Sequence, residues 1–155
     1  MPLDTTAIGR ELEKATLHVD AGRLRYFAKA IGETNPVFTD ADAAVRAGYP
    51  GLVVPPTFLF SIALEAADPF VFLTDLGIDL RTLLHGSQKF TYYGLTHAGD
   101  DLTVVPTVTD IYAKKGGLLE FVEVKSLVYN QHDAKVAEME NVYVVQNSVA
   151  GGDHE

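Results

Sequence analysis

The segment at residues 32–38 reads Gly-Glu-Thr-Asn-Pro-Val-Phe and carries side chains that could perform acid–base chemistry. Glu33 is a carboxylate that could take or give a proton. Asn35 precedes a proline, which is typical of a turn, and its side chain could brace the loop. Phe38 cannot move a proton, so we expect it to line the core or an apolar tunnel. The segment offers one candidate catalytic residue, Glu33, and two candidate substrate-binding residues, Asn35 and Phe38.

A second candidate site lies at the start of an apolar segment, residues 57–67, which we expect to form a helix buried on most sides. Its polar positions Thr57 and Ser61 share one face at i, i+4 spacing. The first backbone N–H groups of a helix have no partner within it, so they can bind an oxygen that carries negative charge. Pro56 has no N–H to donate. The amides of Thr57 and Phe58 are the next donors. The candidate substrate-binding positions in this segment are therefore Pro56, Thr57, Phe58 and Ser61.

The five histidines are separated along the chain, and no two of them have the spacing of metal ligands, so we predict no metal. His85 lies in a strand segment beside Gly86. A histidine in a strand is more often a structural group than a catalyst, but we keep His85 as a second catalytic candidate. His97 lies in a turn and is expected to be exposed. The glycines match neither a dinucleotide-binding fingerprint nor a phosphate-binding loop, so no cofactor is predicted.

Length and composition limit the fold and the partners. A chain of 155 residues with 47% hydrophobic residues is long enough for one domain with its own core. The absence of cysteine excludes disulfides and thiolate chemistry. The formal net charge of −9 opposes binding to nucleic-acid phosphates and to anionic lipid surfaces. We therefore expect neither a nucleic-acid partner nor a membrane partner.

The sequence also predicts the domain limits and the compartment. Residues 1–14 lack the apolar core of a signal peptide. The most apolar stretch, residues 52–72, is interrupted by prolines and acidic residues and is not predicted to cross a membrane. A cytoplasmic location is therefore expected. We expect residues 1–148 to form a single domain and residues 149–155 to form a flexible tail.

The first half of the chain is predicted to contain a short strand and helices. Residues 14–19 have partial strand character, and Asp20 is a suitable N-cap for a helix at residues 21–31. Asp40 caps a second, shorter helix that ends near Ala47. The apolar residues of the first helix form one stripe at i, i+3, i+4 and i+7, namely Leu24, Phe27, Ala28 and Ile31.

The second half is predicted to be all strand. It contains long segments rich in Val, Thr, Tyr and Phe, separated by turn signals, at residues 84–93, 102–112, 118–129 and 136–145. In the third segment Val122, Val124 and Val128 share a face with Glu120 and Ser126. Helices followed by an antiparallel meander predict an α+β fold. We expect a hot-dog fold, in which a curled antiparallel sheet surrounds one buried central helix.

Residues 32–38 resemble the signature of MaoC-like (R)-specific hydratases and dehydratases, which runs Gly-Asp-x-Asn-Pro-(aliphatic)-His. Glu33 stands at the position of the Asp, and Phe38 stands at the position of the His. In that family the Asp and the His form the catalytic pair. The positions that match the signature are Gly32, Asn35, Pro36 and Val37.

Other segments extend the resemblance to about residues 14–145. A His-Gly pair begins the buried helix of the family, and Pro55 and Pro56 fall at that position here. Residues 84–90 and the turn at residues 95–102 are similar to a strand and a (small)-Gly-Asp-x-Leu turn of the family. The pattern most resembles the N-terminal, FAS1-like dehydratase-domain branch. Members of that branch often pair with a MaoC domain that carries an intact Asp and His.

The resemblance implies a subunit of a (R)-3-hydroxyacyl thioester dehydratase or enoyl-CoA hydratase. Its substrate would be an acyl-CoA or an acyl-carrier-protein thioester, and no cofactor would be needed. Because Phe38 and Pro56 replace an acid–base group and an amide donor, we expect a partner MaoC-like subunit to complete the site. Two alternatives are a non-catalytic acyl-CoA-binding homodimer and a hot-dog acyl-CoA thioesterase in which Glu33 directs water. The assembly is expected to be a homodimer or such a heterodimer.

Overall fold

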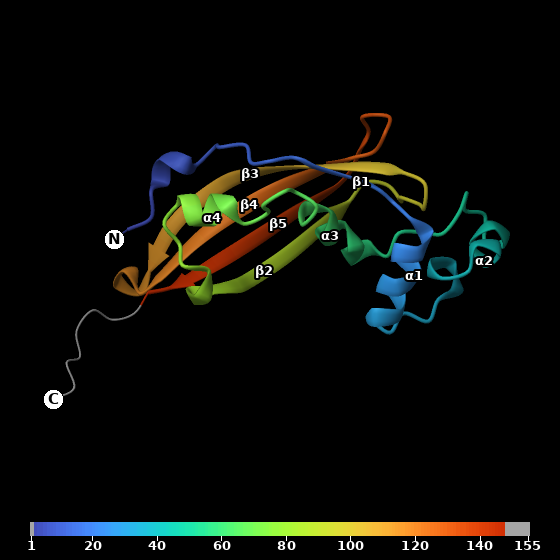
Figure 1. Ribbon diagram of the computed structural model, residues 1–155, viewed down its shortest axis with the longest axis horizontal. Helices are drawn as coiled ribbons and strands as arrows, with labels where there is room; N and C mark the ends of the chain where they lie inside the picture. The colour runs from blue at the N-terminus through green and yellow to red at the C-terminus, as the bar shows by residue number, and fades with distance from the viewer. Residues whose placement is uncertain (1, 148–155) are drawn as a thin grey trace.

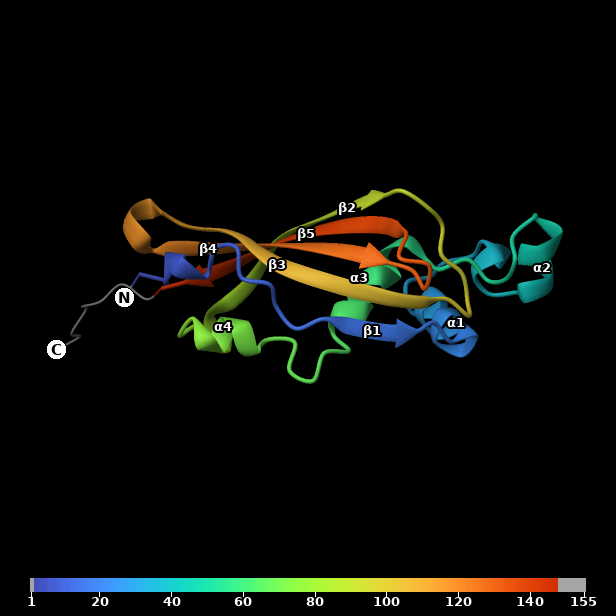
Figure 2. The same cartoon turned by 90° about the horizontal axis from the view of Figure 1, so that it is seen from above.

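The computed structural model describes residues 2–147, so the predicted tail at residues 149–155 lies outside the described residues. A curled five-stranded antiparallel sheet has α3 and α4 against one face, and α1 and α2 lie beyond one end (Figures 1 and 2). The helices are α1 (Ala21–Ala30), α2 (Ala41–Arg46), α3 (Leu59–Ala63) and α4 (Val71–Asp75). The strands are β1 (Ala15–His18), β2 (Leu83–Tyr92), β3 (Asp101–Lys114), β4 (Leu119–Tyr129) and β5 (Lys135–Gln146). The α+β hot-dog prediction is confirmed.

The strand order β1-β3-β4-β5-β2 corrects one expectation. Strands β3, β4 and β5 form the expected meander, but β2 pairs with β5 at the far edge and not with β3. Because β2 and β3 are not neighbours in the sheet, the connection between them is not a hairpin. It forms backbone hydrogen bonds with the loop before α3 instead. The amide of Val54 donates to the carbonyl of Thr96 at 2.9 Å, and the amide of Ala98 donates to Leu52 at 2.8 Å. The chain therefore crosses the end of the domain between these two strands.

Helix α1 begins and ends as its sequence predicts. The carboxylate of Asp20 accepts the backbone N–H groups of Gly22 at 2.8 Å and Arg23 at 3.1 Å, which satisfies two otherwise unpaired donors. Leu24 and Ala28 are fully buried, so the inner face of the predicted stripe is confirmed. Ile31 is 53% exposed, because the helix ends before the stripe completes its second turn.

The central helix is shorter than the predicted span of residues 57–67. A 3-10 turn at Pro56–Phe58 leads into α3, which ends at Ala63. The amide of Leu64 then bonds to Ser61, three residues back, so the helix tightens and stops. A proline at position 69 disfavours helical geometry just before it. Buried side chains on this segment nevertheless pack into the main core, as predicted, and they are Phe58, Leu59 and Ile62.

Glu120 and Ser126 share one face of β4 with the valines, as predicted, and this face is the buried one. Glu120 is 4% exposed, and a buried charge requires partners. One of its carboxylate oxygens accepts the amide of Leu3 at 2.7 Å, and the other accepts the side-chain amide of Asn147 at 2.8 Å. The carboxylate is therefore satisfied by groups from the two ends of the described chain.

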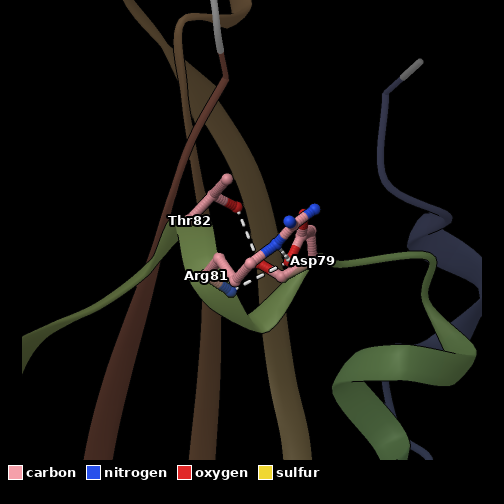
Figure 3. A network of polar contacts seen from close by, with 3 residues as sticks. All are labelled: Asp79, Arg81 and Thr82. Carbon is pink, nitrogen blue, oxygen red and sulfur yellow. Dashed lines mark hydrogen bonds and ion pairs between the residues drawn. The ribbon is translucent and has the colours of Figure 1, made fainter.

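A polar network fixes the start of β2 (Figure 3). The carboxylate of Asp79 accepts the backbone N–H of Arg81 at 3.0 Å and its guanidinium Nη2 at 2.6 Å. The hydroxyl of Thr82 donates to the carbonyl of Asp79 at 2.8 Å. The hydrogen bonds from Arg81 lower the pKa of Asp79 to about 2. This turn sets the direction in which β2 enters the sheet.

No helix within residues 2–147 is long and apolar enough to cross a membrane.

Acid stability should depend on Glu138 at the start of β5. Its carboxylate binds the ammonium groups of Lys125 at 2.7 Å and Lys135 at 2.6 Å, and hydrogen bonds from these two lysines lower its pKa from 4.5 to about 2. A depressed pKa stabilises the folded chain above pH 4.5, and this contribution is lost as the pH falls towards 2. We expect Glu138→Gln to unfold with a weaker pH dependence over that range. Thermal melts from pH 6 to pH 2 test this, and an unchanged pH dependence would contradict it.

Candidate functional site

An open, mostly apolar groove of about 510 Å³ lies between α3 and β2. Helix α1 contributes Phe27 to it, and the α3 segment contributes both polar positions of its predicted face, Thr57 and Ser61. Strand β2 contributes the histidine that the sequence singles out. The full lining is Phe27, Thr57, Phe60, Ser61, His85, Ser87, Gln88 and Phe90. Such a groove suits an apolar chain with a few polar groups to orient it.

A β-bulge in β2 shapes the wall of the groove. His85 pairs with Tyr143 and Ser87 pairs with Val142, so Gly86 is the extra residue between them. A Cβ atom on Gly86 would lie 2.7 Å from Cγ2 of Val144 and 3.1 Å from the carbonyl oxygen of Val142. Only glycine therefore fits at this point of close approach.

We expect Gly86→Ala to lower the free energy of unfolding by about 1–3 kcal/mol, because the added methyl group overpacks the β2–β5 contact. Urea unfolding measures the change. Gly94→Ala is a matched control, since a Cβ atom at Gly94 has no atom within 4 Å and the residue follows the same strand. Equal stability of the two variants would show that the bulge tolerates a side chain.

His85 lies at the junction of the groove and a smaller cavity of about 260 Å³. Its ring centroid is 5.6 Å from that of Phe60 and 5.3 Å from that of Tyr143. Among residues 2–147, no carboxylate lies within ion-pair distance of this imidazole or forms a hydrogen bond with it. His85 is therefore placed to contact a ligand, but it lacks a carboxylate that would orient it as a general base.

Glu33 and Asn35 form part of their own loop. One carboxylate oxygen of Glu33 accepts the amides of Thr34 and Asn35, both at 2.8 Å. The side chain of Asn35 accepts the amide of Val37 at 3.2 Å, so the predicted bracing of the loop by Asn35 is present. Neither side chain lines the groove. The structure therefore separates the carboxylate candidate from the histidine candidate.

The other predicted ligand contacts are divided between the groove and its surroundings. Thr57 and Ser61 line the groove. Phe58 is 3% exposed and packs in the core, Phe38 is half-buried, and Pro56 is exposed. These last three do not line the groove, so their contact with a ligand stays a prediction.

Sequence reasoning did not single out five of the lining residues, Phe27, Phe60, Ser87, Gln88 and Phe90. Two of them carried a signal: Phe27 belongs to the stripe of α1, and Phe60 belongs to the apolar α3 segment. Those on β2 follow the bulge, which shifts the alternation of inward and outward residues. His97 also differs from expectation. It is half-buried against Tyr49, at a centroid distance of 6.1 Å, because its turn packs on the loop before α3.

The curled sheet and the short central helix with a groove beside it define a protein with the hot-dog fold. The sequence model described as "FAS1-like, dehydratase domain region" matches residues 6–139. The chain therefore belongs to the FAS1-like dehydratase domain family. A UPF0336 protein of Streptomyces coelicolor is 37% identical over 132 residues, which cover 84% of this chain and 87% of that protein.

Solved structures show the same fold at lower identity. A chain of the C-terminally truncated HadBC (3R-hydroxyacyl-ACP dehydratase) complex from Mycobacterium tuberculosis superposes with a TM-score of 0.75. It is 22% identical, and the match covers 92% of this chain and 99% of that chain. A MaoC-like dehydratase superposes with a TM-score of 0.80 at 23% identity, covering 92% of this chain and 43% of that one. These structures confirm the fold, and the match of the family model confirms the predicted FAS1-like dehydratase-domain branch.

Proposed function

We propose that this chain is one subunit of a (R)-3-hydroxyacyl thioester dehydratase, or of the enoyl-CoA hydratase that runs the reverse reaction. A partner MaoC-like subunit supplies the Asp and the His, and this chain shapes the acyl-binding groove. The observation that carries the proposal is the composition of the groove. It has mostly apolar walls and one histidine, while Glu33, the carboxylate that the sequence offers as a catalytic candidate, binds the amides of its own loop.

The chemistry explains why such a groove needs a second subunit. Dehydration requires a base for the α-proton, an acid for the departing hydroxyl, and donors for the thioester oxygen. Here Phe38 cannot exchange a proton, and Pro56 has no N–H at the start of the α3 segment. The name of the HadBC neighbour describes a complex, which supports an assembly of more than one chain.

The edge strand β2 provides a surface for the partner. It pairs with β5 on one side only, so the backbone groups of its other edge are free to pair with another chain. Leu84 and Tyr92 on this strand are 54% and 45% exposed. Because β2 also forms one wall of the groove, a partner strand paired there would bring its own side chains close to the groove.

Co-expression tests this assembly. A MaoC-like subunit with an intact Gly-Asp-x-Asn-Pro-(aliphatic)-His segment should co-purify with this chain and elute with it as a heterodimer. Leu84→Asp should weaken the complex by placing a charge on the β2 edge. Leu118→Asp is a matched control, because Leu118 is also exposed but lies in the hairpin between β3 and β4. If the chain forms only homodimers that bind acyl-CoA without turnover, even with that subunit present, the non-catalytic alternative is correct.

The thioesterase alternative requires Glu33 to direct water. We expect Glu33→Gln to leave CoA release from acyl-CoA unchanged, because the glutamine oxygen can still accept the amides of Thr34 and Asn35 and the side chain lies outside the groove. A thiol-trapping assay of free CoA measures the rate. Loss of CoA release in this variant, with the fold intact by circular dichroism, would instead support the thioesterase.

A further inference from the structure

Two amide side chains lie opposite each other on β2 and β5 with unused hydrogen-bonding atoms. Gln88 and Asn141 are directly paired residues in the sheet. Nε2 of Gln88 and Oδ1 of Asn141 are buried, and neither has a hydrogen-bond partner among the described residues. Directly opposed residues project from the same face of a sheet, with Cβ atoms about 5 Å apart. The pair therefore presents one free donor and one free acceptor side by side.

The surroundings of this pair show what it can bind. Gln88 lines the groove together with the aromatic rings of Phe60 and Phe90. Asn141 is 4% exposed and lines a cavity of about 160 Å³ that also contains Ser126 and Tyr143. The amide pair thus lies between the apolar groove and a more polar cavity. A buried polar atom without a partner has a free-energy cost that a bound ligand can relieve.

We propose that Gln88 and Asn141 bind a hydroxyl group on the acyl chain of the ligand. A hydroxyl oxygen can accept from Nε2 of Gln88, and its hydrogen can be donated to Oδ1 of Asn141. A saturated carbon does neither, and a carbonyl oxygen accepts but cannot donate. The pair is therefore a specificity-determining element that selects hydroxyacyl thioesters over saturated ones. This inference rests on the proposed function of the groove.

Calorimetric titration of the full chain, alone and with a partner subunit whose signature histidine is replaced by asparagine to prevent turnover, tests the inference. The probes are (R)-3-hydroxydecanoyl-CoA, ω-hydroxydecanoyl-CoA and decanoyl-CoA, which place the hydroxyl at the reacting carbon, at the chain end, or nowhere. We expect one hydroxylated probe to bind about tenfold more tightly than decanoyl-CoA, as one or two net hydrogen bonds allow. Gln88→Leu and Asn141→Leu should each lower the affinity for the hydroxylated probe more than the affinity for decanoyl-CoA, so that the preference is lost. Lys89→Met is a matched control on the other face of β2 and should retain it.

The outcomes separate this inference from the proposed function. Binding of all three probes with equal affinity would overturn the hydroxyl site and leave the acyl groove intact. Failure of every acyl-CoA to bind would remove both. Thermal melts without ligand give an independent readout: because Nε2 of Gln88 has no partner, Gln88→Leu should not lower the melting temperature. If Gln88→Leu does lower it, and its effect is coupled to that of Asn141→Leu in the double variant, the two amides bond to each other and are not a ligand site.

Discussion

The isolated chain is expected to dehydrate (R)-3-hydroxyacyl-CoA about 10³-fold more slowly than its complex with a MaoC-like subunit that carries the intact Asp and His. A positioned acid–base pair contributes about 10²–10⁴-fold to such a reaction. The groove of this chain contains His85 without a bound carboxylate, and Phe38 occupies the position of the family histidine. Absorbance of the enoyl thioester product, measured with each subunit alone and with the two mixed, gives the rates.

The control for this result separates the roles of the two subunits. Replacement of the partner's signature histidine by asparagine should abolish the activity of the complex. Phe38→His in this chain should not restore activity to the isolated subunit, because residue 38 does not line the groove and Glu33 is bound to its own loop. Turnover by the isolated chain at a rate comparable to that of the complex would refute the requirement for a partner.

The second large effect concerns Phe58, where the central helix begins. We expect Phe58→Ala to reduce the free energy of unfolding by about 3–5 kcal/mol. The side chain is 3% exposed, and its ring meets that of Phe27 edge to face at a centroid distance of 5.3 Å. Truncation removes both the buried apolar surface and the aromatic pair that joins α1 to the α3 segment. Urea unfolding followed by circular dichroism measures the loss.

Phe60→Ala is the matched comparison for this prediction. Phe60 lies two residues further on but is only partly buried, and it faces the open groove. Its truncation should cost clearly less stability, because solvent can occupy the space that the ring leaves. If the two variants lose equal stability, Phe58 does not have the central packing role that its burial indicates.

Local sequence signals predicted most of the secondary structure because the forces that form it are local. Asp20 and Asp40 each cap a helix through their own side chains, as their positions before apolar segments indicated. The runs of β-branched and aromatic residues became β2 to β5, with bounds close to those predicted. The valines of β4 do share one face with Glu120 and Ser126, as predicted, and the structure adds that this face is the buried one.

Long-range contacts explain what the sequence did not predict. The place of β2 beside β5 depends on the loop that crosses the end of the domain, which no local pattern encodes. The apolar pattern also continues past the end of α3, where the amide of Leu64 bonds to Ser61 and the helix stops. At the candidate site, Thr57, Ser61 and His85 were predicted and do share a groove. Glu33 is absent from that groove because its carboxylate is occupied by adjacent amides.

The carboxylate of Glu120 couples the two ends of the described chain to each other. Its two oxygens accept hydrogen bonds from the backbone amide of Leu3 and from the side-chain amide of Asn147. A change at either end that removes its donor would leave half of a buried charge without a partner, which is costly. The effects of tags, fusions or appended domains at the two ends would therefore not be independent. Displacing residue 3 would change the hydrogen bonding of Glu120 with residue 147, and displacing residue 147 would change its hydrogen bonding with residue 3. One buried carboxylate therefore links residues near the two ends of the described chain.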